Sequence, residues 1–338
     1  MNIKTNISLK SYNTFGIDVN AKYFFEFSSV DDLQYLLSDK SLKNEEKLVL
    51  GGGSNILFTR DVDALVLKNE IGGIELINED DTHFYIKAGA GVVWHEFVLY
   101  CINHGYAGIE NLALIPGNVG ASPMQNIGAY GVEIKDVFHS LEAIDIIENK
   151  KVVFTNSECE FGYRESVFKN IYKNQFVITS VVYQLNKTPK YNIEYGAIRE
   201  ELDNMKIDHL SINSIAQAVM NIRRSKLPDP KIIGNAGSFF KNPEISSAEF
   251  ENLKTEFPKL VGYKNENNSV KVAAGWLIEN CGWKGYRIGD AGCHEKQALV
   301  LVNFCNASGD EIYDLSEKII ESVKNKFGIQ LQREVNII

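Results

Sequence analysis

The sequence predicts an α+β protein with about two domains. The chain has 338 residues, of which 44% are hydrophobic and 23% are charged, values typical of a folded globular protein. A chain of this length buries enough surface to fold without disulfide bonds. Its predicted strands come in groups with few helices between them, whereas a parallel α/β sheet would need regular alternation of strands and helices.

The first half of the chain predicts mainly strands. Apolar residues at helical spacing predict one helix over residues 92–104, which Gly105 would end. Short apolar or alternating runs predict strands at 47–50, 64–67, 84–88, 141–147 and 176–185. A turn-rich, charged stretch then predicts a domain boundary between 186 and 211.

The second half predicts helices and a final strand. Asn213 is expected to cap a helix that Pro228 ends, and another helix is expected over 272–279. The clearest amphipathic helix spans 312–327, with one apolar stripe formed by Leu315, Ile319, Ile320, Val323 and Phe327. Residues 329–338 alternate between apolar and polar, which is typical of a strand with one buried face.

Charge and cysteine content argue against several classes of protein. A net charge of −9 disfavours a nucleic-acid partner, because phosphate contacts need clustered Lys and Arg. Five cysteines without a C-x-x-C pair and six histidines without ligand spacing disfavour a disulfide framework and a metal site. The chain begins without an apolar signal core and has no run of about 20 apolar residues, so we expect a cytoplasmic protein with no membrane partner.

Two glycine-rich segments are candidates for binding a ligand. Residues 51–55 place three glycines, Ser54 and Asn55 directly after a predicted strand, where exposed N–H groups can hold an anion; the alternative is a tight turn. Residues 116–131 contain four glycines and no charged residue. Such a loop would suit a flat, partly apolar ligand, and the alternative is a buried structural loop.

A basic segment and three single residues complete the candidates. Residues 223–241 carry five basic residues against one aspartate, and this net +4 could hold a phosphate or pyrophosphate. For Arg223 and Arg224 the alternative, a solvated helix face, stays open. Ser238 follows two glycines without forming a G-x-S-x-G motif, so its spacing alone favours a turn serine. Arg164 is within reach of Tyr163 for stacking and of Glu165 for a structural ion pair. Glu334 could face a pocket or water.

The chain resembles the bacterial UDP-N-acetylenolpyruvoylglucosamine reductase (UDP-N-acetylmuramate dehydrogenase) family over nearly its whole length. Any one of the matching segments is weakly specific, but their common order makes coincidence very unlikely. The segments are residues 13–16, 51–55, 115–131, 163–166, 225–231, 234–243 and 332–335.

This resemblance implies a fold and an activity. The fold is a two-lobed FAD-binding region of the vanillyl-alcohol-oxidase (PCMH) type over 1–205, split near 70, followed by an α+β substrate-binding domain over 206–328. Residues 329–338 would be a terminal strand that returns to the active site. The implied enzyme is a monomeric oxidoreductase of peptidoglycan synthesis, with non-covalent FAD and with NADPH as co-substrate. It would reduce the enolpyruvyl ether of UDP-N-acetylglucosamine to UDP-N-acetylmuramate.

The resemblance also implies site residues by position. The family's catalytic residues match Arg164, Ser238 and Glu334, and its substrate-binding residues match Tyr195, Lys226, Asn242 and Gln297. The FAD-binding positions are Gly51, Gly52, Gly53, Ser54, Asn55, Pro116, Gly117, Gly120, Ala121, Gln125, Asn126, Gly128, Ala129, Tyr130 and Gly131.

Each catalytic residue has a role that its chemistry allows. Hydride addition to the vinyl carbon pushes negative charge onto the substrate carboxylate, which Arg164 and Glu334 would stabilise. Ser238 would protonate the other carbon. Tyr195 matches the loop tyrosine of one of the family's two types, which closes over the substrate diphosphate.

Two other functions remain as alternatives. A flavin oxidase of the same fold would act on an alcohol, and it would not need the basic segment or the three catalytic positions. A nucleotide-binding protein without activity could keep the fold, although the intact catalytic set argues against it.

Overall fold

The computed structural model describes residues 3–265 and 268–338, which form two compact units. The first unit comprises the chain up to Ile7, Ala21–Gly53 and Asp63–Ser225, and the second comprises Ser8–Asn20, Ser54–Val62 and Lys226–Ile338. Two N-terminal segments thus belong to the mainly C-terminal unit. The domain boundaries expected at 205/206 and 328/329 stay a prediction.

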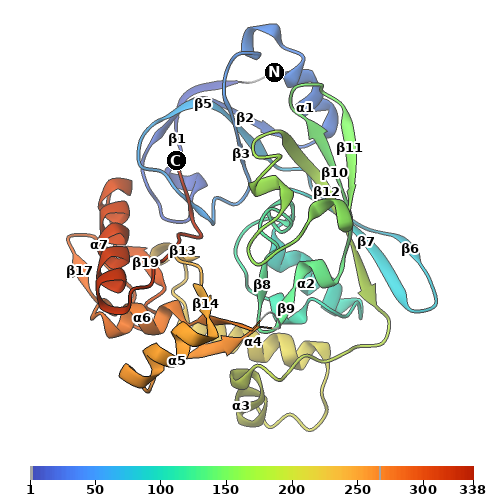
Figure 1. Cartoon of the computed structure of the whole chain (residues 1–338). Helices are drawn as coiled ribbons and strands as arrows, with labels where there is room; N and C mark the ends of the chain where they lie inside the picture. The colour runs from blue at the N-terminus through green and yellow to red at the C-terminus, as the bar shows by residue number, and fades with distance from the viewer. Residues whose placement is uncertain (1–2, 266–267) are drawn as a thin grey trace. The chain divides into compact units, whose positions relative to one another are not determined.

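A five-stranded antiparallel sheet forms the centre of the first unit (Figure 1). Its order is β11 (Lys151–Thr155), β10 (Phe138–Asp145), β12 (Phe176–Asn186), β7 (His83–Gly89) and β6 (Ile74–Glu79). Buried side chains of α2 (Trp94–Asn103) and α4 (Ile212–Lys226) share one core with this sheet. The predicted strands at 84–88, 141–147 and 176–185 are therefore confirmed within a few residues at their ends.

Helix α2 buries Phe97 and Cys101, as the apolar spacing predicts, but Val93 and His104, which that spacing puts on the same face, are exposed. Trp94 and Phe97 pack on the Tyr183 ring of β12, with ring centroids 5.7 and 4.8 Å from it. The helix ends as expected, because Gly105 has a φ of 76° and donates its N–H to the carbonyl of Ile102.

A second sheet in the first unit has four strands, in the order β1 (Lys4–Ser8), β2 (Asn20–Phe27), β5 (Val62–Asn69) and β3 (Lys47–Leu50). Strands β3 and β5 are parallel, and both predicted strands are confirmed. Helix α1 (Val30–Leu37), capped by the Ser29 side chain, buries Leu33 and Leu36 in the core of this sheet. Strand β3 leads directly into the glycine triplet at 51–53.

The second unit contains a four-stranded sheet in the order β13 (Gly234–Ser238), β19 (Val300–Asn303), β18 (Ala291–Cys293) and β17 (Arg287–Ile288). Helix α7 (Gly309–Phe327) contacts β18 and β19 (Figure 1). It begins in a capping box between Ser308 and Glu311 and ends at Gly328, whose φ is 70°. Its predicted apolar stripe is buried.

Shorter elements complete the two units. In the first unit these are α3 (Gly196–Asn204) and the hairpin of β8 (Gly128–Ala129) and β9 (Val132–Glu133). The second unit adds α5 (Ser247–Glu256), α6 (Ala274–Asn280), the sheet of β14 (Glu244–Ser246), β16 (Ser269–Val272) and β15 (Gly262–Lys264), and the pair β4 (Ile56–Leu57) and β20 (Asn336–Ile337). Among the described residues, no helix combines the length and apolarity needed to cross a bilayer.

Two local predictions need correction. Helix α4 begins at Ile212, and its cap is Ser211 rather than Asn213, because the Ser211 and Ser214 side chains each accept the other residue's backbone N–H. The strand predicted over 329–338 is regular only at β20, which pairs in parallel with β4. Leu331 and Val335 are buried as the alternation requires, but single bonds replace a continuous ladder there.

Candidate active site

The predicted site residues are distributed between the two units. The first unit holds residues 51–53 and 116–131, Arg164 and Tyr195. The second unit holds Ser54, Asn55, Lys226, Ser238, Asn242, Gln297 and Glu334.

The two glycine-rich segments meet in the first unit. A Cβ added to Gly52 would lie 2.7 Å from Oδ1 of Asn118 and 3.0 Å from Cα of Gly117. The Asn118 side chain is itself fixed, since its Nδ2 donates to the Gly91 carbonyl over 2.6 Å. A side chain at position 52 would therefore push the two segments apart.

The uncharged loop at 116–131 has a buried side and a more exposed side. Ser122 is fully buried and its hydroxyl lies 2.6 Å from that of Tyr183. Asn126 is fully buried too. Its Nδ2 donates to Glu133 and to the Gly162 carbonyl, and its Oδ1 accepts the N–H of Lys135. These residues anchor the loop from within, as the structural alternative proposed.

The more exposed side of this loop carries most of the predicted FAD positions. It is formed by Pro116, Gly117, Gly120, Ala121, Gln125, Gly128, Ala129, Tyr130 and Gly131, all half-buried or exposed. The loop therefore combines a structural anchor with a side that is open to a ligand. Contacts between these residues and FAD stay a prediction.

Leu114, just before this loop, has a left-handed backbone conformation with a φ of 61°. This conformation is unfavourable for a residue with a Cβ. Two side chains hold it in place: Nδ1 of His95 accepts the Leu114 N–H over 3.0 Å, and Nε of Arg223 donates to the Leu114 carbonyl over 3.2 Å. The path of the chain into the loop therefore depends on His95 and Arg223.

Arg223 and its neighbour Arg224 differ in their surroundings. Arg224 is exposed, which agrees with the solvated helix face. Arg223 is half-buried, and withdrawal from water lowers the pKa of its guanidinium, while interaction with Tyr130 opposes this change. The nearby positive charge of Arg164 lowers the pKa of Arg223 further. The charges of Arg164 and Arg223 thus act on each other within the first unit.

Arg164 stands at the tip of a tight hairpin. Gly162 and Glu165 pair with each other on either side of it, and Arg164 has a φ of 57°. Its Nη2 donates to the carbonyl of Gly128 over 2.7 Å, and its guanidinium lies 5.5 Å from the Tyr163 ring centroid, as the predicted stacking requires. A non-glycine residue in this region costs on the order of 1 kcal/mol, and such conformations cluster at functional sites.

Tyr195 lies beside the end of the loop at 116–131. Its ring centroid is 5.4 Å from that of Tyr130 in an edge-on arrangement, and 47% of its surface is exposed. The segment before it is tied to the loop, because Nδ2 of Asn111 donates to the carbonyls of both Asn192 and Tyr130. Tyr195 itself is the residue that immediately precedes α3.

Ser238 and Glu334 lie on neighbouring backbone segments of the second unit. Ser238 is the last residue of β13, and the Glu334 N–H donates to the carbonyl of the next residue, Phe239, over 2.8 Å. On the other side, Nδ2 of Asn55 donates to the Glu334 carbonyl over 3.3 Å. The backbone of Glu334 is therefore held from two directions.

Asn242 and Gln297 converge at the start of α6 in the same unit. Oδ1 of Asn242 accepts the N–H of Ala274, the first residue of α6, over 3.0 Å. Oε1 of Gln297 lies 3.1 Å from the position of a Cβ built on Gly275. Because Phe239 also donates to the carbonyl of Leu299, two residues after Gln297, these side chains belong to the same part of the unit as Ser238.

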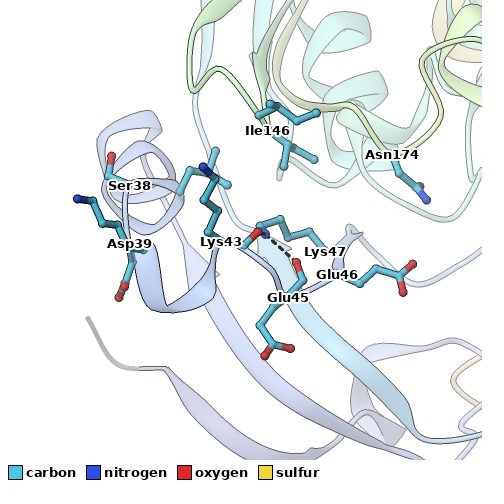
Figure 2. A pocket seen from close by; sticks show the side chains of 11 residues that line it. Ser38, Asp39, Lys43, Glu45, Glu46, Lys47, Ile146 and Asn174 are labelled. Atoms are coloured by element: carbon cyan, nitrogen blue, oxygen red, sulfur yellow. Dashed lines mark hydrogen bonds between the residues drawn. The ribbon is translucent and has the colours of Figure 1, made fainter.

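A pocket of about 450 Å³ in the first unit contains none of the predicted site residues. It lies around Lys47 at the start of β3 (Figure 2). The glycine triplet follows the other end of that strand. Nζ of Lys47 donates to the backbone carbonyls of Leu42, Lys43 and Glu45, so its charge is engaged within the protein.

His95 gives the structure a testable dependence on pH. Burial, and then the charges of Arg224 and Arg223, lower its pKa, while Glu96 acts weakly in the opposite direction. Neutral His95 accepts the Leu114 N–H, and protonation would remove that acceptor. A histidine in the unfolded chain has a pKa of about 6.5. The stabilisation from the His95–Leu114 hydrogen bond is therefore present above that pH, and it is lost as the pH falls through the lower pKa of His95 in the folded protein.

We expect His95→Asn to lose less thermal stability than the parent between about pH 7.5 and 5, because the amide oxygen still accepts the N–H and does not titrate. Melting temperatures across this range measure the effect. His209→Asn, at an exposed position, is the control and should follow the parent. Equal pH slopes in His95→Asn and the parent would contradict this role.

The comparisons with known proteins agree with these features. Residues 229–338 match the family model of the UDP-N-acetylenolpyruvoylglucosamine reductase C-terminal domain, and residues 21–152 match an FAD binding domain. A Flavobacterium johnsoniae UDP-N-acetylenolpyruvoylglucosamine reductase is 51% identical over 339 residues, with 100% of both chains covered. The reductase of Amoebophilus asiaticus is 49% identical over 338 residues, again with 100% of both covered.

A solved structure shows the same fold. The UDP-N-acetylenolpyruvylglucosamine reductase of Thermus caldophilus superposes with a TM-score of 0.69 at 23% identity, covering 100% of this chain and 99% of its own. The predicted α+β fold with an FAD-binding region is confirmed. The chain belongs to the UDP-N-acetylenolpyruvoylglucosamine reductase family and is a flavin-dependent oxidoreductase of peptidoglycan synthesis.

Proposed function

We propose that the chain uses NADPH to reduce the enolpyruvyl ether of UDP-N-acetylglucosamine to UDP-N-acetylmuramate, with Arg164, Ser238 and Glu334 as catalytic residues. Relatives about half identical over their full length carry the reductase name, which supports the reaction class. The observation that carries the residue assignment is the bond between Phe239 and Glu334, since it sets two of these residues on adjacent backbones.

The residues of the two glycine-rich segments fit FAD. Gly52 approaches Gly117 and Asn118 so closely that the backbone itself forms the surface there, and backbone N–H groups suit a pyrophosphate. We propose that residues 51–55 hold the pyrophosphate and that the exposed side of 116–131 holds the flat ring. Bound FAD supplies two-electron hydride chemistry between NADPH and the substrate.

Arg164 is proposed to stabilise negative charge on the substrate carboxylate. Its guanidinium is fixed by the Gly128 carbonyl and by the turn that carries it, so little reorganisation is needed when charge develops. The adjacent Arg223 adds a second positive charge. Glu334 would assist by donating a hydrogen bond to the same carboxylate, which requires the Glu334 carboxyl to carry a proton.

Ser238 is proposed to donate the proton that completes the reduction. The residue is exposed at the end of β13, after Gly237, whose φ is 70°. A glycine turn of this kind can present a hydroxyl at a sharp angle to the strand. A positioned proton donor contributes typically about 10²–10⁴-fold in rate.

The substrate is proposed to contact Tyr195, Lys226, Asn242 and Gln297. Tyr195 and Lys226 would meet the diphosphate, and exposure of both side chains leaves them accessible to it. Asn242 and Gln297 would bind near the start of α6, where the two converge. We further propose a monomer that works in the cytoplasm, in line with its five thiol cysteines.

Anaerobic reduction of the purified protein tests this function. NADPH should bleach the yellow flavin colour, and the enolpyruvyl substrate should restore it. Ser238→Ala should keep the rate of bleaching but slow the return of colour by about 10²-fold or more, because only the second step needs the proton.

Ser246→Ala is the control for this experiment. It removes the side-chain cap of α5 in the same unit, so it should lower stability and leave both rates unchanged. A protein recoloured only by oxygen would contradict the reductase and favour the oxidase alternative. A protein without flavin colour would contradict both flavin enzymes. Equal slowing of both steps in Ser238→Ala would refute the proton-donor role.

Arg223→Met should weaken FAD binding by about 10-fold or more, because it removes a charged hydrogen bond that holds Leu114 at the entry to the loop. Quenching of FAD fluorescence on titration of the apoprotein measures the dissociation constant. Arg224→Met removes the same charge from the exposed neighbouring position and should change this constant by less than about 2-fold. Equal weakening in both variants would show a general charge effect instead.

A further inference from the structure

Arg333 fastens the C-terminal segment to α7. Its Nε donates to Oγ of Ser316 over 2.8 Å, and its Nη2 lies 2.6 Å from Oε1 of Glu317. Its guanidinium also lies 4.5 Å from the ring centroid of Tyr313. All three partners lie on α7, so a single side chain ties residue 333 to a rigid element.

The burial of these groups makes this attachment strong for an ion pair near the surface. Only 18% of the Arg333 side chain is exposed, against 50% for Glu317, and Ser316 is fully buried. Hydrogen bonds from Arg333 and then from Tyr313 lower the pKa of Glu317. Most exposed ion pairs are weak because solvent screens the two charges. Partial burial of Arg333 reduces this screening.

The backbone of Arg333 is held where it adjoins Glu334. Arg333 forms an antiparallel bridge with Phe240, and the following N–H donates to the Phe239 carbonyl. Successive side chains of an extended, paired segment leave the backbone on opposite faces. A side chain fixed on α7 at position 333 therefore directs the side chain at 334 to the other face.

We propose that Arg333 is a positioning residue for Glu334. It fixes the rotation of the terminal segment about its axis and so sets the place of the Glu334 carboxyl beside the strand that ends in Ser238. The proposal rests on the catalytic role proposed for Glu334. It also explains why a charged residue occupies a position that the alternation of 329–338 assigns to the buried face: the charge reaches Ser316 and Glu317.

Kinetic measurement of Arg333→Met, Glu334→Ala and the double variant in the FAD-loaded enzyme tests this role. We expect Arg333→Met to slow flavin reoxidation by the enolpyruvyl substrate by about 10- to 100-fold, because small misplacements of reacting groups have such costs. Flavin reduction by NADPH should change by less than about 2-fold. In the Glu334→Ala background the same substitution should cost less than about 2-fold, since the group that it positions is absent.

Two further variants separate positioning from stability. Arg333→Lys keeps the charge near Glu317 and should recover part of the rate. Arg287→Met is the matched control, because Arg287 also stacks on a ring, that of Phe304 at 4.1 Å, and pairs with Asp290. It should lower the melting temperature without changing either flavin step. Faster amide exchange over 331–336 in Arg333→Met would report the loosened segment independently of activity.

The outcomes distinguish this inference from the proposed function. Additive losses in the double variant, or unchanged amide exchange in Arg333→Met, would overturn the positioning role and leave the role of Glu334 intact. A fully active Glu334→Ala would overturn both. A rate lost equally in Arg333→Met and Arg287→Met would show that Arg333 acts through stability alone.

Discussion

The second unit depends on the return of the chain's end to segments far away in sequence. Ile338 accepts the N–H of Thr59, Asn336 donates to the Asn55 carbonyl, and Glu334 donates to the Phe239 carbonyl. These bonds incorporate the N-terminal segment 54–62 into a unit that is otherwise C-terminal. The last of these bonds pairs the backbone of Glu334 with the residue that follows Ser238. The pairing that completes the fold therefore also assembles part of the candidate site.

The first unit depends on a different constraint, the close approach of two glycine-rich segments. The approach at Gly52 requires a residue without a Cβ, and the unfavourable conformation of Leu114 requires His95 and Arg223. The loop at 116–131 is thereby fixed at its entry, and Ser122 and Asn126 anchor it from within. A surface built in this way is formed before a ligand arrives, which reduces the entropic cost of binding.

Much of the fold could be predicted from the sequence because its elements follow periodic patterns. Helix α7 and the strands of the five-stranded sheet bury their apolar faces as the spacing requires. The terminal segment could be predicted only as alternating, because its partners, residues 55–57 and 239–241, are distant in sequence and offer single bonds rather than a ladder. The cap of α4 was misassigned because Ser211 and Asn213 are both good capping residues.

The sequence names candidate catalytic residues only where family motifs carry them, as for Arg164, Ser238 and Glu334, and their roles stay a prediction. His95 leaves no local signal in the sequence, because its contact with Leu114 arises from the fold. Arg333 shows in the sequence only as a charge on the apolar side of the alternation in 329–338.

A crystal structure of FAD-loaded Ser238→Ala with the enolpyruvyl substrate bound would test the proposed catalytic set most directly. We expect Arg164 and Glu334 both to contact the substrate carboxylate, with residue 238 facing the vinyl group and the Phe239–Glu334 bond intact. A substrate carboxylate that meets neither residue would contradict this set.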